Sequence, residues 1–303
     1  MVGTRNQQKR KIWKTALFFS PSILLLGVFF IGPMIMTVFF SFTDISLTGS
    51  SAQAMKFVGF RNFIEIFKDP KLLTVLKNTM VFLVFSGIIG QQCLGFLLAS
   101  LMRGKNRLVR KFVGFTVVAG WITPEVIAAF MFSSFFADAG TLNKIIGIFG
   151  ASPVSWLFTF PMACVVIANI WKGSAYSMMM FQASLDNISD DIVEAARIDG
   201  AGGLQILLRI TLPMIKSTMA TTFVIVTLST LGAFGLVFAM TGGGPAIMTT
   251  TLSIFMYQKA FIAYQIGYGM AIALFILAIG ILLSLVSVSY THLDVYKRQY
   301  LNG

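Results

Sequence analysis

The stretch that decides the fold of this sequence is EAARIDGAGGLQILLRITLPMIK, Glu194–Lys216, which lies between two long apolar runs. Just before it, Ser189 is a good helix N-cap. Asp190 and Asp191 then place negative charge on the first turn, where the helix dipole favours it. Gly200 follows the last periodic residue and suits a left-handed C-terminal cap. The pattern predicts a short helix between Ser189 and Gly200.

A second short helix is predicted at about Leu204–Leu212, ending near Pro213. In the first helix, Ile192, Ala195 and Ala196 share one face at i, i+3 and i+4 spacing. Alanine is small, so another surface can approach this face closely. Two interpretations follow from the residues alone. Either the helix folds back on its own bundle, or it is a docking element for a cytosolic partner.

The composition places this chain in a membrane. Only 11% of its 303 residues are charged and 56% are hydrophobic, with a mean hydropathy of +0.83, whereas a soluble domain carries about 25% charged residues. The net charge of +12 does not indicate nucleic-acid binding, because the basic residues form short clusters between apolar spans and no binding motif interrupts them. Cys93 and Cys164 lie inside apolar spans and are expected to be buried hydrophobes. Neither they nor the single histidine, His292, form a metal-ligand pattern.

Six stretches are long and apolar enough to be membrane-crossing helices, which need about 20 residues. They cover roughly 16–40, 78–102, 112–136, 158–183, 217–240 and 267–289. The first follows a basic N-terminus, residues 1–15. Its apolar run is too long for a signal peptide, and no small-residue cleavage site follows, so we expect a retained anchor.

The basic residues predict the orientation of the spans. With six helices, one face receives the N-terminus, residues 103–111, the loop 184–216 and the tail. That face carries fifteen of the 23 Lys and Arg residues, and the other carries seven. The excess marks the first face as cytoplasmic. We therefore expect a multi-pass protein of the bacterial inner membrane, with a cytosolic N-terminus and a cytosolic loop at 184–216.

The tail, residues 290–303, differs from the rest of the chain. Its sequence YTHLDVYKRQYLNG has no helical apolar pattern and follows the last span abruptly. It resembles a linker-derived string seen at the broken ends of open reading frames from environmental DNA. We expect an artefactual end, with a natural short cytosolic tail as the alternative, and take 16–289 as the membrane domain.

The opening stretch also carries a family resemblance. EAARIDGA followed by ITLP resembles the EAA signature of permease subunits of bacterial ABC importers, in particular the binding-protein-dependent carbohydrate permeases of the maltose and glycerol-3-phosphate type. The matching positions are Glu194, Ala195, Ala196, Asp199, Gly200 and Ala201, then Ile210, Leu212 and Pro213. Similar motifs continue over roughly 15–289, among them GTLN, IWK and GGPAIMT. Leu207 and Ser217 depart from the pattern, standing where an aromatic residue and a proline are usual.

The resemblance implies an all-α membrane protein with six transmembrane helices in the type I ABC importer permease fold. It implies that residues 189–213, named here the coupling segment, dock into a cytosolic ATPase dimer that binds ATP and Mg. It also implies a second permease subunit and an extracytoplasmic solute-binding protein as partners, with a sugar or related polar solute as cargo. This chain would be no enzyme and would hold no cofactor or metal. The sequence is compatible with ATP binding by a separate subunit, since it contains no G-x-x-x-x-G-K-[ST] phosphate loop.

Two other classes of membrane protein have different sequence features. A self-sufficient secondary transporter usually has more helices and an internal inverted repeat. A polytopic membrane enzyme needs an intramembrane catalytic set, such as metal-binding histidines or paired carboxylates. The sequence displays none of these features, so an importer permease remains the leading prediction.

Glu125 and Lys172 are the only ionisable residues deep within the predicted spans. Each would cost about 2.5–3.5 kcal/mol if it faced lipid, so both should face the bundle interior near the midplane. They either form a structural ion pair or line the translocation path. Pro124 should loosen the third helix beside Glu125. Other candidates for the path are the polar and aromatic residues Asn169, Trp171, Tyr176 and Gln91.

Overall fold

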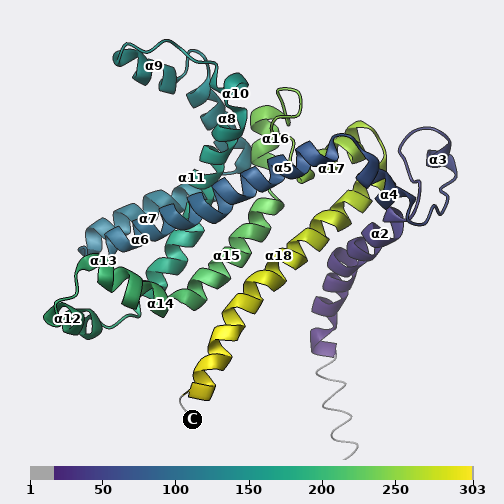
Figure 1. The fold of residues 1–303 in the computed structure, drawn as a ribbon. Coiled ribbons are helices and arrows are strands. Elements are labelled where there is room, and N and C mark those ends of the chain that lie inside the picture. The colour runs from purple at the N-terminus through teal and green to yellow at the C-terminus, as the bar shows by residue number, and fades with distance from the viewer. Residues whose placement is uncertain (1–16, 302–303) are drawn as a thin grey trace, which may run out of the picture. The chain divides into compact units, whose positions relative to one another are not determined.

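The structure is a computed structural model that describes the backbone of residues 17–301 and the side chains of residues 17–285. Over this range the chain is helical, joined by loops, with one isolated antiparallel bridge between Thr43 and Phe57. It divides into two compact units, Met1–Asp69 with Met256–Phe275 and Pro70–Phe255 with Ile276–Gly303. The prediction of an all-α membrane protein is confirmed (Figure 1).

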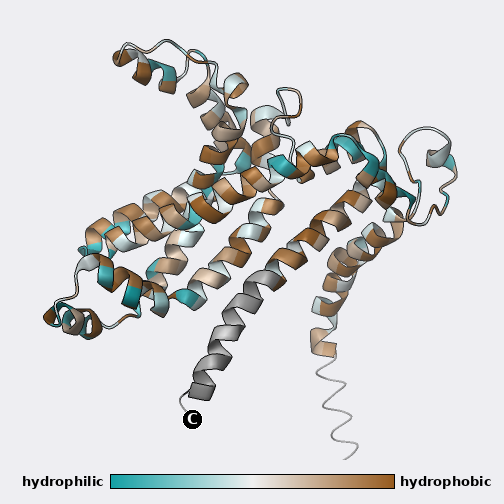
Figure 2. Ribbon diagram, in the orientation of Figure 1, coloured by the Kyte–Doolittle hydropathy of each residue, from teal (hydrophilic) through white to brown (hydrophobic). Residues whose placement is uncertain are grey.

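Four helical stretches of the described chain are long and apolar enough to cross a membrane. They are Leu17–Ser41, Leu72–Met102, Glu125–Ile148 and Ile266–Leu285. A fifth candidate is the pair Gly203–Met214 and Lys216–Leu231, bent by 70° at the join. Apolar residues dominate these helices in Figure 2. Leu72–Met102 is built from α5 (Leu72–Phe82), a π-helical stretch η2 (Leu83–Gln91) and α6 (Gln92–Met102).

The predicted span 112–136 is two helices in the structure, α7 (Arg107–Ile122) and α8 (Glu125–Phe136). Proline disfavours the α conformation in the residue before it. Thr123 accordingly has φ −55° and ψ 126°, and the chain leaves the helix at this point. The predicted loosening at Pro124 is therefore a complete break between two helices.

The next two predicted spans also differ from simple apolar helices. The span 158–183 falls on α11 (Pro161–Asp186), which is one continuous helix of 26 residues. It is long enough to cross a membrane, but Asn169 and Lys172 make it more polar than the four helices above. The span 217–240 is interrupted, because α15 (Lys216–Leu231) ends before α16 (Gly235–Thr241) begins.

The larger unit is centred on α11, which packs along α6 and η2. Glycines allow the close approach: a Cβ on Gly95 would lie 2.5 Å from the Cβ of Ser177, and one on Gly90 2.3 Å from the side chain of Ile170. Small residues at helix contacts are typical of membrane proteins. A buried apolar cluster lies on this framework and includes Phe82, Ala128, Cys164, Ala168, Val237 and Ile254. The remaining helices of this unit are α9 (Thr141–Ile148), α10 (Trp156–Thr159) and α17 (Leu252–Tyr257), whose last two residues belong to the smaller unit.

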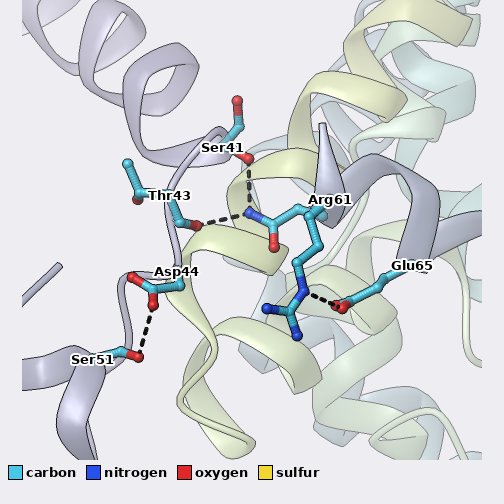
Figure 3. A network of polar contacts seen from close by, with 7 residues as sticks. Ser41, Thr43, Asp44, Ser51, Arg61 and Glu65 are labelled. Carbon is cyan, nitrogen blue, oxygen red and sulfur yellow. Dashed lines mark hydrogen bonds and ion pairs between the residues drawn. The ribbon is translucent and has the colours of Figure 1, made fainter. Parts of the chain in front are cut away.

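The smaller unit contains η1 (Gly27–Ile31), α2 (Gly32–Ser41), α3 (Ser50–Gln53), α4 (Arg61–Lys68), η4 (Gln258–Ile262) and the start of α18 (Ile266–Leu301). The buried Asn62 amide donates to the carbonyl oxygens of Ser41 and Thr43, each at 2.8 Å. Its neighbour Arg61 pairs with Glu65 at 2.8 Å. Figure 3 shows this polar network, which joins α4 to the chain that follows α2.

Candidate functional site

The coupling segment begins with a capped helix. Ser189 adopts the extended conformation of an N-cap, and its Oγ accepts a hydrogen bond from the backbone N–H of Asp191 at 3.3 Å. The helix α12 then runs over Asp190–Ile198, with Asp190 and Asp191 in its first turn. The predicted N-cap and the predicted acidic first turn are both confirmed.

Gly200 ends this helix in the left-handed conformation, with φ +82°. The N–H of Gly200 donates to the carbonyl of Arg197 at 3.0 Å, and that of Ala201 to the carbonyl of Ala196 at 2.9 Å. These bonds supply donors to carbonyl groups that have no hydrogen-bond partner within the helix at its C-terminal end. The prediction of a left-handed C-terminal cap is confirmed.

The second half of the coupling segment is one helical stretch, Gly203–Met214. It consists of α13 (Gly203–Ile206), the π-helical η3 (Leu207–Thr211) and α14 (Leu212–Met214). It starts one residue before the predicted Leu204 and ends at Met214, one residue after Pro213, so the predicted end near Pro213 is confirmed. The chain then bends by 70° into α15.

The coupling segment both packs on the bundle and exposes an apolar surface. Val193 and Leu212 pack against the buried cluster around Phe181 and Leu185. Two large apolar side chains of the segment are exposed: Ile198 is 86% exposed and Leu204 is 69% exposed. The interpretation that the segment folds back on its own bundle is therefore confirmed in part, and docking to a cytosolic partner stays a prediction.

Charged groups tether α12 to the neighbouring helix ends. Arg103, just after α6, donates to the carbonyl of Ile188 at 3.3 Å and lies 3.6 Å from the carboxylate of Asp190. Arg110 in α7 pairs with Asp186 at the end of α11. Asp190 is highly exposed, so its pair contributes about 0–1 kcal/mol. The contacts of Arg103 fix the position of α12 more than they stabilise the fold, whereas the Arg110 pair joins α7 to α11.

A cavity of about 910 Å³ lies between the coupling segment and these helix ends. Its charged lining residues are Arg103, Arg110, Arg197, Asp186, Asp190 and Glu194. The expected coupling residues are divided around it. Glu194 and Ala201 line the cavity, whereas Ala195, Asp199 and Gly200 are exposed on the outside and Ala196 is half-buried. Ile210 and Pro213 line a separate pocket of about 420 Å³, and Leu212 is half-buried.

Lys172 binds the end of a broken helix. Its Nζ donates to the carbonyl oxygen of Thr123 at 2.8 Å and lies 3.5 Å from that of Trp121. Both carbonyls belong to the C-terminal end of α7, where the helix carries partial negative charge. The cation thus satisfies backbone groups that the break at Pro124 sets free.

Glu125 lies at the other side of the same break, in the first turn of α8. The structure records no ion pair between Glu125 and Lys172, which are both described residues. Instead the Glu125 carboxylate lies against Gly235, the first residue of α16: a Cβ on Gly235 would be 2.3 Å from Glu125 Oε2. The ion pair considered as one interpretation is absent from this arrangement.

The other candidate residues of the path fall into two groups. Trp171 and Tyr176 lie near the break: the ring of Trp171 is 5.5 Å from that of Phe132, and the ring of Tyr176 is 6.5 Å from that of Trp121. Asn169 and Gln91 are buried. Asn169 donates to Ser86 Oγ at 2.9 Å, and Gln91 lies against Gly173, where a Cβ would meet its Oε1.

Sequence reasoning missed three partners at this site, namely Trp121, the carbonyl of Thr123, and Gly235. The Thr123–Pro124 dipeptide is a signal for the first two, because a residue before proline leaves the helix and frees the preceding carbonyls. Gly235 is 110 positions from Glu125 in the sequence, and nothing in its own neighbourhood marks it.

Comparison with known proteins gives a consistent result. Residues 92–294 match the model of the family described as "Binding-protein-dependent transport system inner membrane component". The chain is 30% identical to the sulfoquinovosyl glycerol transport system permease protein SmoG of Agrobacterium fabrum, covering 87% of this chain and 85% of that protein. It is 32% identical to the multiple sugar-binding transport system permease protein MsmF of Streptococcus mutans, covering 89% and 91%.

A third relative and a solved structure extend the comparison. The trehalose/maltose transport system permease protein MalF of Thermococcus litoralis is 30% identical over 93% of this chain and 94% of its own length. Among solved structures, a chain of a bacterial alginate ABC transporter, crystallised with a periplasmic protein that binds alginate pentasaccharide, superposes with a TM-score of 0.78. It covers 93% of this chain and 94% of its own length at 21% identity, which shows a shared fold.

Proposed function

The chain belongs to the family of binding-protein-dependent transport system inner membrane components, and from that premise we propose that it is the permease subunit of an ATP-driven importer for a carbohydrate or related polar solute. The solute class comes from the relatives, whose names refer to sulfoquinovosyl glycerol, multiple sugars, and trehalose or maltose. The protein is a multi-pass membrane protein, and we place its N-terminus on the cytosolic side of the bacterial inner membrane because basic residues are in excess there.

The observation that carries the coupling proposal is the outward apolar surface of the coupling segment. Ile198 and Leu204 are large apolar side chains that are exposed in this chain, while the helix that bears Ile198 is capped at both ends and tethered by Arg103. A rigid, capped helix with an open apolar surface suits a groove on another protein. We assign this groove to a separate cytosolic ATPase dimer, which binds ATP and Mg and performs the hydrolysis.

We propose that the solute path passes the break between α7 and α8. Backbone that leaves the helix at membrane depth is tolerated where it is buried in protein or lines a water-filled cavity. Lys172, Trp171, Tyr176 and Glu125 all lie at or near this break. A second permease subunit would form the other wall, and an extracytoplasmic binding protein would deliver the solute. Asn169 and Gln91 we assign to packing between α11 and η2, since both are buried there.

The coupling proposal can be tested with two matched isoleucines in the same unit. Ile198 ends α12 and is 86% exposed, and Ile148 ends α9 and is 81% exposed. In Figure 1, α9 lies away from α12, which lies with α13 beside the end of α6. Ile198 and Ile148 are each replaced by arginine in separate variants of the permease, co-expressed with its transport partners. The amount of ATPase that co-purifies with each variant is measured together with solute uptake.

We expect Ile198→Arg to reduce ATPase association at least about tenfold, because a charge placed at the centre of an apolar contact costs more than 1–2 kcal/mol. Ile148→Arg should retain both association and uptake. If the two variants bind the ATPase equally, whether both bind it normally or both fail to bind it, the result would argue against docking at α12.

A further inference from the structure

A second pocket shares Arg110 with the coupling segment's cavity, and every charged residue that lines it is basic. It measures about 480 Å³ and is lined by Lys105, Arg107, Arg110, Lys111 and Gln182. Its lining contains four cations and no carboxylate. In this it differs from the larger cavity of about 910 Å³, where three arginines face three acids.

Three of the four cations are not neutralised by the protein. Arg110 is paired with Asp186. For the side chains of Lys105, Arg107 and Lys111, which are all described and exposed, the structure records no hydrogen bond or ion pair. Like charges held this close repel each other, so an anion bound among them would be stabilised. The pocket is therefore built to accept negative charge from outside the chain.

The surface next to the basic pocket indicates what kind of anion it is. Leu108, Phe112 and Phe115 repeat at i, i+4 and i+7 on α7, so they share one face of the helix. Their exposed fractions are 78%, 73% and 77%. This apolar stripe starts beside Arg107 and Lys111 and runs away from them along the helix. A free phosphate ion has no apolar part that could cover this stripe, whereas a lipid presents an anionic headgroup joined to an apolar chain.

We propose that Lys105, Arg107 and Lys111 bind the phosphate of an anionic phospholipid, whose acyl chain lies along Leu108, Phe112 and Phe115. The headgroup phosphate accepts hydrogen bonds from the two ammonium groups and the guanidinium. Basic pockets at the ends of membrane helices are suited to such headgroups. This site does not depend on the transported solute or on the ATPase, so its test stands apart from that of the proposed function.

The test uses the full permease with its co-purifying partners, placed in nanodiscs of phosphatidylcholine or of an equimolar mixture of phosphatidylcholine and phosphatidylglycerol. After detergent extraction, the lipid that stays bound is identified by native mass spectrometry. The test variant is Lys105→Gln/Arg107→Gln/Lys111→Gln. The control is Lys56→Gln/Lys68→Gln/Lys77→Gln, which removes the same charge from exposed positions elsewhere.

We expect the wild type and the control to retain phosphatidylglycerol in preference to phosphatidylcholine, and the test variant to lose that preference. A basic side chain near an anionic surface contributes about fivefold, so three together contribute about a hundredfold. Retention should also weaken as salt is added, because the contacts are exposed to screening.

Three results would overturn the proposal. The first is equal retention of phosphatidylglycerol by the test variant and the control. The second is complete displacement of the lipid by inorganic phosphate at equal concentration, which would make this a soluble-phosphate site. The third is loss of a protein partner from the test variant with lipid retention unchanged, which would make the basic face a protein contact.

Discussion

The Nζ atom of Lys172 in α11 lies 2.8 Å from the carbonyl oxygen of Thr123, at the point where α7 stops and before α8 starts. Backbone that leaves a helix at membrane depth needs a partner in the protein or in a water-filled cavity, because lipid acyl chains donate no hydrogen bonds. The partial negative charge at the C-terminal end of α7 also stabilises the ammonium group. One lysine thus makes two costly features tolerable together, a broken helix and a half-buried cation.

Replacing Lys172 with methionine should destabilise the protein. The methionine keeps the length of the side chain but leaves the carbonyl of Thr123 without its donor, at a cost of about 1–3 kcal/mol. Lys172→Arg, which retains a donor, should recover most of the loss. The free energy of unfolding is measured in mixed micelles by titration with denaturing detergent. A methionine variant as stable as the wild type would contradict the assigned contact.

Glu125 and Gly235 should be coupled across the second contact at this break. Gly235→Ala adds a Cβ that would lie 2.3 Å from Glu125 Oε2, so the carboxylate must move. Gly232→Ala is the matched control, since its Cβ would have 3.6 Å to the nearest atom. We expect Gly235→Ala alone to lower uptake and stability. In a double-mutant cycle with Glu125→Ala, the effects of the two substitutions on the free energy of unfolding should be non-additive by about 0.5–3 kcal/mol. Additive effects would indicate that the two residues do not meet.

Local chemistry explains why some of this site was predictable and some was not. Ser189 and Gly200 act on backbone groups within a few residues of themselves, so capping rules identify both ends of α12 from sequence alone. Lys172 binds a backbone carbonyl 49 positions away, and a carbonyl carries no residue-type signal. The similar depth of Lys172 and Glu125 in the predicted spans therefore suggested an ion pair as one interpretation, whereas the structure places each side chain against a different group at the break.

Gly200 should be required for coupling because of its backbone conformation. At φ +82° an alanine is strained by roughly 1–2 kcal/mol, although a Cβ there would meet nothing within 4 Å. Gly203→Ala is the control, because that glycine is equally open and has no positive φ. We expect Gly200→Ala to lower solute uptake per ATP hydrolysed, and Gly203→Ala to leave it unchanged. Gly200→Arg should abolish coupled uptake while the protein stays in the membrane. Full coupling in Gly200→Ala would show that the left-handed cap is dispensable.

The loop that contains Asp44 should loosen in acid. The backbone N–H of Lys56 and, more weakly, the hydroxyl of Ser51 donate to the Asp44 carboxylate, and these bonds lower its pKa below the ordinary value. A lowered pKa means that the ionised form is favoured in the folded loop. The added stability is therefore complete above the ordinary pKa of about 4 and is lost as the pH falls through the lower folded value. The protection factors of residues 44–58, which correct the exchange rates for the pH dependence of intrinsic amide exchange, should fall over that window in the wild type. Asp44→Asn should show low protection factors that do not change over the same window, because its side-chain amide does not titrate. An acid transition that persists in this variant would have to come from another group.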